Sequence, residues 1–324
     1  MTCTPIVFLI FNRPLETMRV FDKIREVRPE KLLVVADGPR SSRPGEAALC
    51  RQTRAVLDRV DWPCQVLTDF ADTNMGCARR IASGLEWAFE EVEEAIIVED
   101  DCLPDPSFFP YCDELLERYR SDERIMMISG NNFQNGASRT SDSYYFSHLP
   151  QIWGWATWRR AWRHFDFAMS DWPQRRDSGW IKAVAKNPEL DRRWRQYFDY
   201  VVAGKIDTWA YRWMYCVLAR NGLSIVPDVN LVTNIGFGPA ATHTFVPDER
   251  YVVPSRAMEF PLRHSTTVKP CHEADEFEKV YLHRLTLLHR IYLRLRPMVG
   301  LVRPVLERTG LWARLRAAVV RLRV

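Results

Sequence analysis

Residues 95–101 read Ala-Ile-Ile-Val-Glu-Asp-Asp, a short apolar run that ends in three adjacent carboxylates. A continuous apolar run is typical of a strand buried on both faces, as in a parallel sheet. Three acids at the end of a rigid strand suit a hard divalent cation, Mg²⁺ or Mn²⁺, which takes oxygen ligands and keeps positions open for water and phosphate. The alternative is a solvated acidic turn, because such triplets are common.

Strand and helix signals alternate on the N-terminal side of this stretch. Apolar runs predict strands at Pro5–Phe11, Lys31–Ala36 and Cys64–Leu67. Helical spacing predicts the intervening helices at Leu15–Val27, Arg51–Val60 and Asn74–Phe89. This order indicates an α/β fold with a mostly parallel, doubly wound sheet flanked by helices, whose ligand crevice lies beyond the carboxyl ends of the strands.

The pattern continues less regularly towards residue 270. We expect helices at Phe108–Arg120, Trp180–Lys186, Asp191–Val202 and Trp209–Asn221, and strands at Ile125–Ser129 and Leu223–Val226. A polar loop is expected at Gly130–Ser143 and a Gly-bearing loop at Asn234–Thr244. No domain boundary can be read between these elements. Residues 1–270 are therefore interpreted as one catalytic domain and residues 271–324 as a basic helical tail.

Several classes of protein are disfavoured by composition and motifs. Hydrophobic residues make up 47% of the 324 and charged residues 27%, which is globular composition. The sequence has neither a GxGxxG dinucleotide fingerprint nor a Walker loop. It has no uncharged run of 18 apolar residues and no basic leader before its first apolar run, so we expect neither a spanning helix nor a signal peptide. The 8 cysteines form no CxxC pair, which favours a reduced, cytoplasmic setting.

The charge is distributed unevenly along the chain. Residues 279–324 contain 11 of the 45 basic residues and one of the 41 acidic residues, so the rest of the chain carries a net charge of −6. An acidic body argues against a nucleic-acid partner. The tail interleaves arginines with apolar residues at helical spacing and includes Trp312, a pattern that suits an anionic membrane surface. We therefore expect a protein peripheral to the inner face of the cell membrane; a helix packed back on the body and an RNA-binding helix are the alternatives.

A resemblance emerges from the acidic triplet and the segment that follows it. IIVEDDCLPDPSFFPYCDELLERY, residues 96–119, resembles the strand, acidic triplet and helix of the N-acetylglucosaminyltransferase I family, glycosyltransferases of the GT-A fold. Further segments occur in the same order as in that family, over about residues 5–245; they are IVFLIFNR (6–13), VVADG (34–38), Trp153-Gly154-Trp155, Asp207-Thr208-Trp209 and NIGFGPAATHT (234–244). The chain is also similar to bacterial nucleotide-diphospho-sugar transferases, including those labelled hemolytic-protein-like.

The resemblance implies roles for the polar residues at the strand ends. Asp101 would bind the metal, and Glu99 and Asp100 would hold the ribose and support the site. Asp37 would accept the imide N–H of uracil, although Asp37-Gly38-Pro39 is also a strong turn signal. Arg13, and one of Arg79 and Arg80, would contact the nucleotide or its diphosphate; neighbours on a helix cannot both face it.

The remaining implied residues concern the acceptor and the reaction. Asp207 is the candidate general base, with capping of its own helix as the alternative. Trp153 and Trp155 would stack on sugar rings, whereas Trp158 and Trp162, four residues apart, are expected in the core. Thr242 and His243 would close over the diphosphate.

Together these features predict a metal-dependent, inverting glycosyltransferase. It would move a sugar from a nucleotide diphosphate, UDP favoured, to a hydroxyl of a glycan or lipid-linked acceptor. A non-catalytic nucleotide-sugar or glycan-binding protein is the alternative, since only one acid precedes Trp209. A sugar-1-phosphate nucleotidyltransferase is a weaker one, because the segment FNRPLET (11–17) lacks glycines.

Overall fold

The computed structural model describes residues 4–237 and 250–283. By its internal contacts the chain divides into two compact units, Met1–Glu278 and Lys279–Val324. Most of the second unit, including Trp312, lies outside the described residues. The predicted boundary at residue 270 and the predicted tail helix therefore stay predictions.

The first unit is built on an eight-stranded sheet of order β3-β2-β1-β4-β8-β6-β9-β7. The first four strands in this order are mutually parallel, as the sequence predicts; they are β3 (Gln65–Phe70), β2 (Lys31–Ala36), β1 (Ile6–Ile10) and β4 (Glu94–Glu99). β6 (Ile125–Ser129) and β9 (Leu223–Pro227) form a further parallel pair. The predicted fold class, a mostly parallel α/β sheet flanked by helices, is confirmed.

Two strands of the main sheet and a small second sheet are absent from the sequence prediction. β8 (Trp155–Trp158) inserts between β4 and β6, antiparallel to both, and β7 (Tyr144–Ser147) pairs antiparallel with β9 at the edge. β5 (Cys102–Pro104) pairs with β10 (Val232–Asn234) in a separate two-stranded sheet. These strands have three or four residues, which is too short for a hydrophobic period to identify them.

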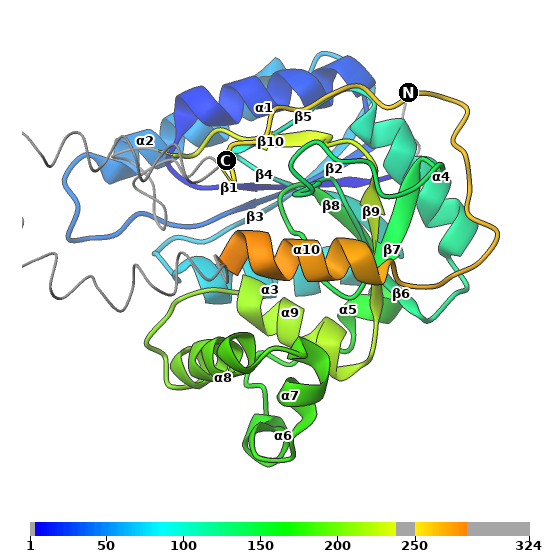
Figure 1. Cartoon of the computed structure of the whole chain (residues 1–324). Helices are drawn as coiled ribbons and strands as arrows, with labels where there is room; N and C mark the ends of the chain where they lie inside the picture. The colour runs from blue at the N-terminus through cyan, green and yellow to red at the C-terminus, as the bar shows by residue number, and fades with distance from the viewer. Residues whose placement is uncertain (1–3, 238–249, 284–324) are drawn as a thin grey trace, which may run out of the picture. The chain divides into compact units, whose positions relative to one another are not determined.

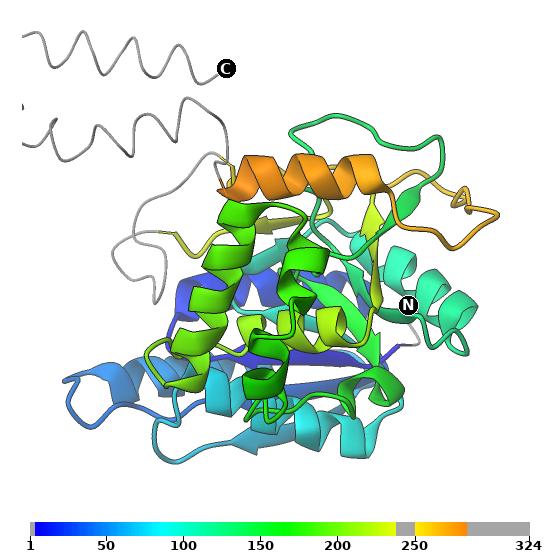
Figure 2. The same ribbon diagram turned by 60° about the horizontal axis from the view of Figure 1, so that its bottom comes forward.

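The helices cover both faces of the sheet (Figure 1). The cluster on one face joins strand residues such as Phe8 to α1 (Pro14–Val27) and α4 (Phe108–Tyr119), and α2 (Glu46–Arg54) and η1 (Ala55–Arg59) pack against α1. The cluster on the other face joins the alternate strand residues to α3 (Cys77–Glu91), α5 (Arg159–Trp162) and α9 (Ala210–Ala219). Figure 2 brings this second side forward, with the outer helices α6 (Trp172–Arg176), α7 (Trp180–Ala185) and α8 (Pro188–Val202).

The edge strand β7 is covered by a segment from the C-terminal side of the chain. The Ser143 N–H donates to the Arg263 carbonyl at 2.9 Å, and the Cys271 N–H donates to the Phe146 carbonyl at 2.7 Å. The helix that follows, α10 (His272–His283), places Asp275 against the Ser147 hydroxyl, at 2.6 Å. Covering an edge in this way removes a template for strand-to-strand aggregation. No helix among residues 4–237 and 250–283 is long and apolar enough to cross a membrane.

Gly84 sets the distance between α3 and the sheet. A Cβ added there would lie 2.3 Å from Cγ1 and 2.9 Å from Cγ2 of Val35, a β-branched side chain with little freedom to move. We expect Gly84→Ala to lower the free energy of unfolding, because overpacking costs about 1–3 kcal/mol and the better helix propensity of Ala returns only about 1 kcal/mol. Chemical denaturation measures the change.

The matched variant is Gly84→Ala in a Val35→Ala background, where both Cγ atoms are gone and only the Cβ of residue 35 remains, 3.1 Å from the added Cβ. There the same substitution should cost much less, so the double-mutant cycle should show coupling between the two positions. Stabilisation by Gly84→Ala in the unaltered chain would contradict the close approach.

Candidate active site

The acidic triplet lies where β4 ends beside β1. The Asp100 N–H donates to the Leu9 carbonyl at 2.9 Å, and the Phe11 N–H donates to Asp100 Oδ2 at 3.0 Å. Asp100 is buried and is joined to β1 through both its backbone N–H and its side chain, whereas Glu99 and Asp101 are half-buried. The triplet is a fixed part of the sheet end and not a solvated turn.

Arg13 forms an ion pair with the last acid of the triplet. Its Nη1 lies 2.6 Å from Asp101 Oδ2, and the two side chains are 13% and 21% exposed. Burial lowers the pKa of the Arg13 guanidinium, but attraction to Asp100 and Asp101 outweighs burial and leaves the pKa above its ordinary value. Arg13 thus lies beside the triplet, and its described ion-pair partner is an acid of the chain itself. Its contact with a nucleotide stays a prediction.

The other two acids of the triplet have raised pKa values. Burial, followed by the negative charge of Asp101, raises the pKa of Asp100 to about 7. Burial and the charges of Asp101 and Asp100 also raise the pKa of Glu99 well above its ordinary value. Because like charges in a partly desolvated site disfavour ionisation, an additional cation would stabilise this group.

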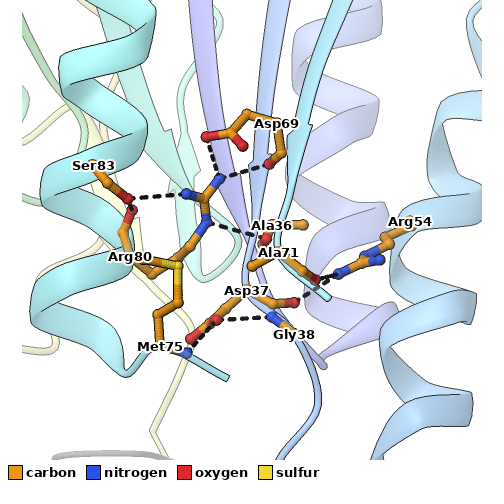
Figure 3. A network of polar contacts seen from close by, with 9 residues as sticks. All are labelled: Ala36, Asp37, Gly38, Arg54, Asp69, Ala71, Met75, Arg80 and Ser83. Carbon is orange, nitrogen blue, oxygen red and sulfur yellow. Dashed lines mark hydrogen bonds and ion pairs between the residues drawn. The ribbon is translucent and has the colours of Figure 1, made fainter. Parts of the chain in front are cut away.

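Asp37 directly follows β2, and its carboxylate accepts hydrogen bonds from groups of the chain itself. Oδ1 accepts from the N–H groups of Gly38 and Met75, both at 2.8 Å (Figure 3). Oδ2 accepts from Asn74 Nδ2 at 2.9 Å and from Gly76 N–H at 3.2 Å. Four donors fill the acceptor positions of one carboxylate. Of the two interpretations of Asp37, the structure therefore favours the turn residue over the reader of uracil.

Arg80 does not face the crevice. Its guanidinium and Nε bind the Ala36 carbonyl, the Asp69 carbonyl and carboxylate, and the Ser83 hydroxyl, so it joins the ends of β2 and β3 to α3 (Figure 3). The prediction that Arg80 meets the diphosphate is wrong, because this side chain is 5% exposed and fully engaged with the sheet. Arg79 is exposed, with its guanidinium 5.7 Å from the centroid of the Phe167 ring, so the two neighbours do face different ways.

Asp207 caps a helix, although not the one that follows it. Oδ2 accepts from Cys77 N–H at 3.0 Å and Oδ1 accepts from Ala78 N–H at 3.1 Å, at the N-terminus of α3. At the start of α9, the Ala210 N–H donates instead to Thr208 Oγ1 at 3.2 Å. The carboxylate of Asp207 is thereby held beside the strand ends by a contact that spans 130 residues of sequence.

Cys77 marks the point at which these acids converge. Burial raises the pKa of its thiol, and the charges of Glu99, Asp207, Asp101 and Asp37 raise it further. The side chains that the sequence analysis selected at three separate places in the chain therefore lie within electrostatic range of one side chain. No motif signals Cys77; only its position after Gly76, at the first turn of a helix, relates it to the site.

The two tryptophans of the Trp-Gly-Trp segment have different environments. Trp155 is fully buried and stacks on Trp209, with ring centroids 5.5 Å apart. The prediction that Trp155 stacks on a sugar is wrong, because its ring is part of the core. Trp153 is half-buried and contacts Phe133, Phe237 and Tyr251 edge to face. The expectation that Trp158 and Trp162 pack in the core is confirmed.

The loop after β10 lies directly against Asp101. The Ile235 N–H donates to the Asp101 carbonyl at 2.8 Å, and a Cβ added to Gly236 would lie 2.1 Å from Asp101 Oδ2. Only glycine allows the backbone to approach this close. Sequence reasoning selected Thr242 and His243 in the same loop, and both lie outside the described residues.

The residues present fit a metal only in part. Within the described chain, no group of three or more His, Cys, Asp or Glu side chains is placed to hold an ion by itself. The chemistry of the donors is suitable, since three carboxyl groups share one guanidinium and two of them have raised pKa values. A cation here would draw one or two ligands from Asp101 and its neighbours and the rest from a bound anion and water.

No protein-family model and no curated protein matches the sequence. Distant likenesses exist among solved structures. A structure of GalNAc-T7 with UDP, GalNAc and Mn²⁺ has a TM-score of 0.41 and 10% identity, over 70% of this chain and 43% of that one. An apo structure of mouse xyloside xylosyltransferase 1 has a TM-score of 0.30 and 10% identity, over 67% and 82%. UDP-glucose pyrophosphorylase with UDP-glucose has a TM-score of 0.28 and 11% identity, over 49% and 78%. The chain thus spans less than half the length of the GalNAc-T7 chain.

The reassigned role of Arg80 can be tested against its neighbour. Arg80→Met should lower the free energy of unfolding by about 3 kcal/mol, because it breaks a largely buried ion pair and leaves strand carbonyls without donors. We expect the low end of the usual range because the Asp69 side chain keeps 31% exposure. Arg79→Met, one residue away and exposed, should change stability by no more than about 0.5 kcal/mol. Equal effects in chemical denaturation would contradict this assignment.

Proposed function

We propose that this protein is a glycosyltransferase that moves a sugar from a nucleotide-diphosphate donor to a hydroxyl acceptor. The observation that carries the proposal is the convergence of the acidic triplet, Arg13 and Asp207 at the carboxyl ends of β1, β2 and β4. In open α/β sheets this edge is where ligands bind. Buried acids that share one guanidinium suit an ion bound to a pyrophosphate better than they suit a neutral ligand.

The donor side of the site supports Mn²⁺ or Mg²⁺ held by Asp101, with Glu99 and Asp100 in support. When bound, the ion supplies charge neutralisation for a departing nucleotide diphosphate. The protein's own part is to fix Asp100 on β1 and to keep Asp101 at the lip of the sheet. UDP is the favoured nucleotide on the resemblance to N-acetylglucosaminyltransferase I, and closure by Thr242 and His243 stays a prediction from the same source.

The acceptor side of the site rests on Asp207 and Trp153. The two backbone N–H groups that donate to Asp207 use one acceptor position on each oxygen. The carboxylate therefore keeps capacity to take the proton of an attacking hydroxyl. A single base suits inversion, because nucleophile and leaving group lie on opposite faces of the sugar. Trp153, half-buried among other aromatic rings, is the candidate to contact a glycan or lipid-linked acceptor.

Release of free nucleotide from a panel of activated sugars tests the proposal, with Mn²⁺ or Mg²⁺ and with simple glycan acceptors. Unaltered protein should turn over at least one UDP-sugar. Asp101→Ala should lose both turnover and metal-dependent nucleotide binding. Asp207→Asn should lose turnover but keep nucleotide binding, because the base acts only on the acceptor.

Asp207→Asn also weakens a helix cap, which typically costs about 1 kcal/mol, so its stability has to be measured beside its activity. A loss of turnover far greater than the loss of folded protein supports the base role. Tight nucleotide-sugar binding with no turnover for any donor and acceptor would favour the alternative, a binding protein on the same fold.

We further propose that the basic segment places the protein at the cytoplasmic face of an anionic membrane. The support is its composition, 11 basic residues and one acidic residue in 279–324, because each basic residue near an anionic surface contributes about 1 kcal/mol. Such placement would favour a lipid-linked acceptor.

Truncation after His283 keeps α10 whole and tests this placement. The full chain should sediment with vesicles that contain anionic lipid, and the truncated chain should stay in the supernatant. Vesicles of neutral lipid are the control, and binding to them should be weak for both proteins. Equal binding of the two proteins to anionic vesicles would refute the membrane role.

A further inference from the structure

The side chain of Arg13 does not cap its own helix. Arg13 is the N-cap residue of α1 and makes no side-chain cap bond. A positive charge is unfavourable at a helix N-terminus, and Arg lacks the short oxygen-bearing side chain that caps well. Its backbone does serve the helix, since the Arg13 carbonyl accepts from Thr17. The side chain instead reaches Asp101.

The Asp101 oxygen that Arg13 contacts is enclosed from two directions. Arg13 Nη1 lies 2.6 Å from Oδ2, and the Gly236 backbone approaches so closely that an added Cβ would lie 2.1 Å from Oδ2 and 2.7 Å from Arg13 Nη1. Two cations cannot share this oxygen at contact distance without strong repulsion, since Coulomb energy grows as separation and dielectric fall. A divalent ion at Oδ2 and Arg13 in its present position are therefore alternatives.

We propose that Arg13 is an internal counter-ion that holds Asp101 in the metal-free protein and exchanges with the divalent cation. This inference rests on the proposed function, because the group that accepts Arg13 after the exchange is the diphosphate of the donor. The guanidinium fork suits phosphate oxygens as well as carboxylate oxygens. Asp101 then has a cation beside it at both stages.

The exchange makes the binding of metal and diphosphate cooperative. A cation on Asp101 releases Arg13 towards a phosphate, and a phosphate that takes Arg13 opens Asp101 to the cation. Thermodynamic linkage requires the two effects to be equal, so nucleotide tightens metal binding by the factor by which metal tightens nucleotide binding. Arg13 would thus keep Asp101 paired until the complete donor complex arrives.

The test measures Mn²⁺ affinity of the full chain by electron paramagnetic resonance, with and without UDP. Without nucleotide, Arg13→Gln should bind Mn²⁺ at least fivefold more tightly than the unaltered chain, because the competing cation is gone. The factor by which UDP tightens Mn²⁺ binding should shrink in this variant. Asp101→Asn should abolish Mn²⁺ binding in both backgrounds.

Two further variants keep the result interpretable. Arg13→Lys retains the charge on a shorter side chain without the planar fork, and should give intermediate values even if Arg13→Gln folds poorly. Arg19→Gln removes an exposed arginine from the same helix, and should leave Mn²⁺ affinity unchanged. Thermal unfolding checks that each variant is folded.

Unchanged or weaker Mn²⁺ binding in folded Arg13→Gln and Arg13→Lys overturns the exchange, as does Mn²⁺ binding that survives Asp101→Asn or is absent from the unaltered chain. The proposed function fails separately. If Mn²⁺ binding behaves as expected but no activated sugar is turned over, the exchange stands and the transferase proposal falls. If an activated sugar is turned over but the Mn²⁺ affinity does not depend on Arg13, the transferase proposal stands and the exchange falls.

Discussion

The constraint on which the site depends is the double pairing of β1. This strand lies between β2 and β4, parallel to both, and every one of its five residues is buried. Parallel pairing brings the carboxyl ends of neighbouring strands to the same edge of the sheet. Asp100 is fixed there by hydrogen bonds to Leu9 and Phe11, on either side of the last residue of β1. The polar residues of the site are positioned because an apolar strand has no freedom to shift.

The polar groups around this edge divide into those whose hydrogen-bonding capacity is used within the chain and those that keep acceptor capacity unused. Asp37 and Arg80 are saturated by partners within the chain, and they hold the loop before α3 and the ends of β2 and β3 (Figure 3). Asp101 and Asp207 keep unused acceptor capacity beside the thiol of Cys77. A supporting acid and a reacting acid look the same in sequence, because the difference lies in the number of donors that each finally meets.

Burial at the strand ends also sets the electrostatics. Asp100 and Glu99 are raised in pKa because the sheet desolvates them and places them beside Asp101. A single guanidinium offsets this group, and the loop at Gly236 closes on the ion pair from the other side. Electrostatic strain of this kind is characteristic of functional sites, where a ligand completes the balance of charge.

The sequence by itself determined the α/β class, the parallel strands β1, β2, β3 and β4, and the position of the acidic triplet at a strand end. These follow from local patterns, because a buried parallel strand is apolar throughout and its last polar residues must leave the core. Tertiary structure decided which of the selected residues are occupied by partners within the chain and which are not. Trp155 lies in the core because α9 brings Trp209 against it, and Asp207 caps α3 across 130 residues of sequence. Such partners are joined by packing between distant elements, which no local period or spacing encodes.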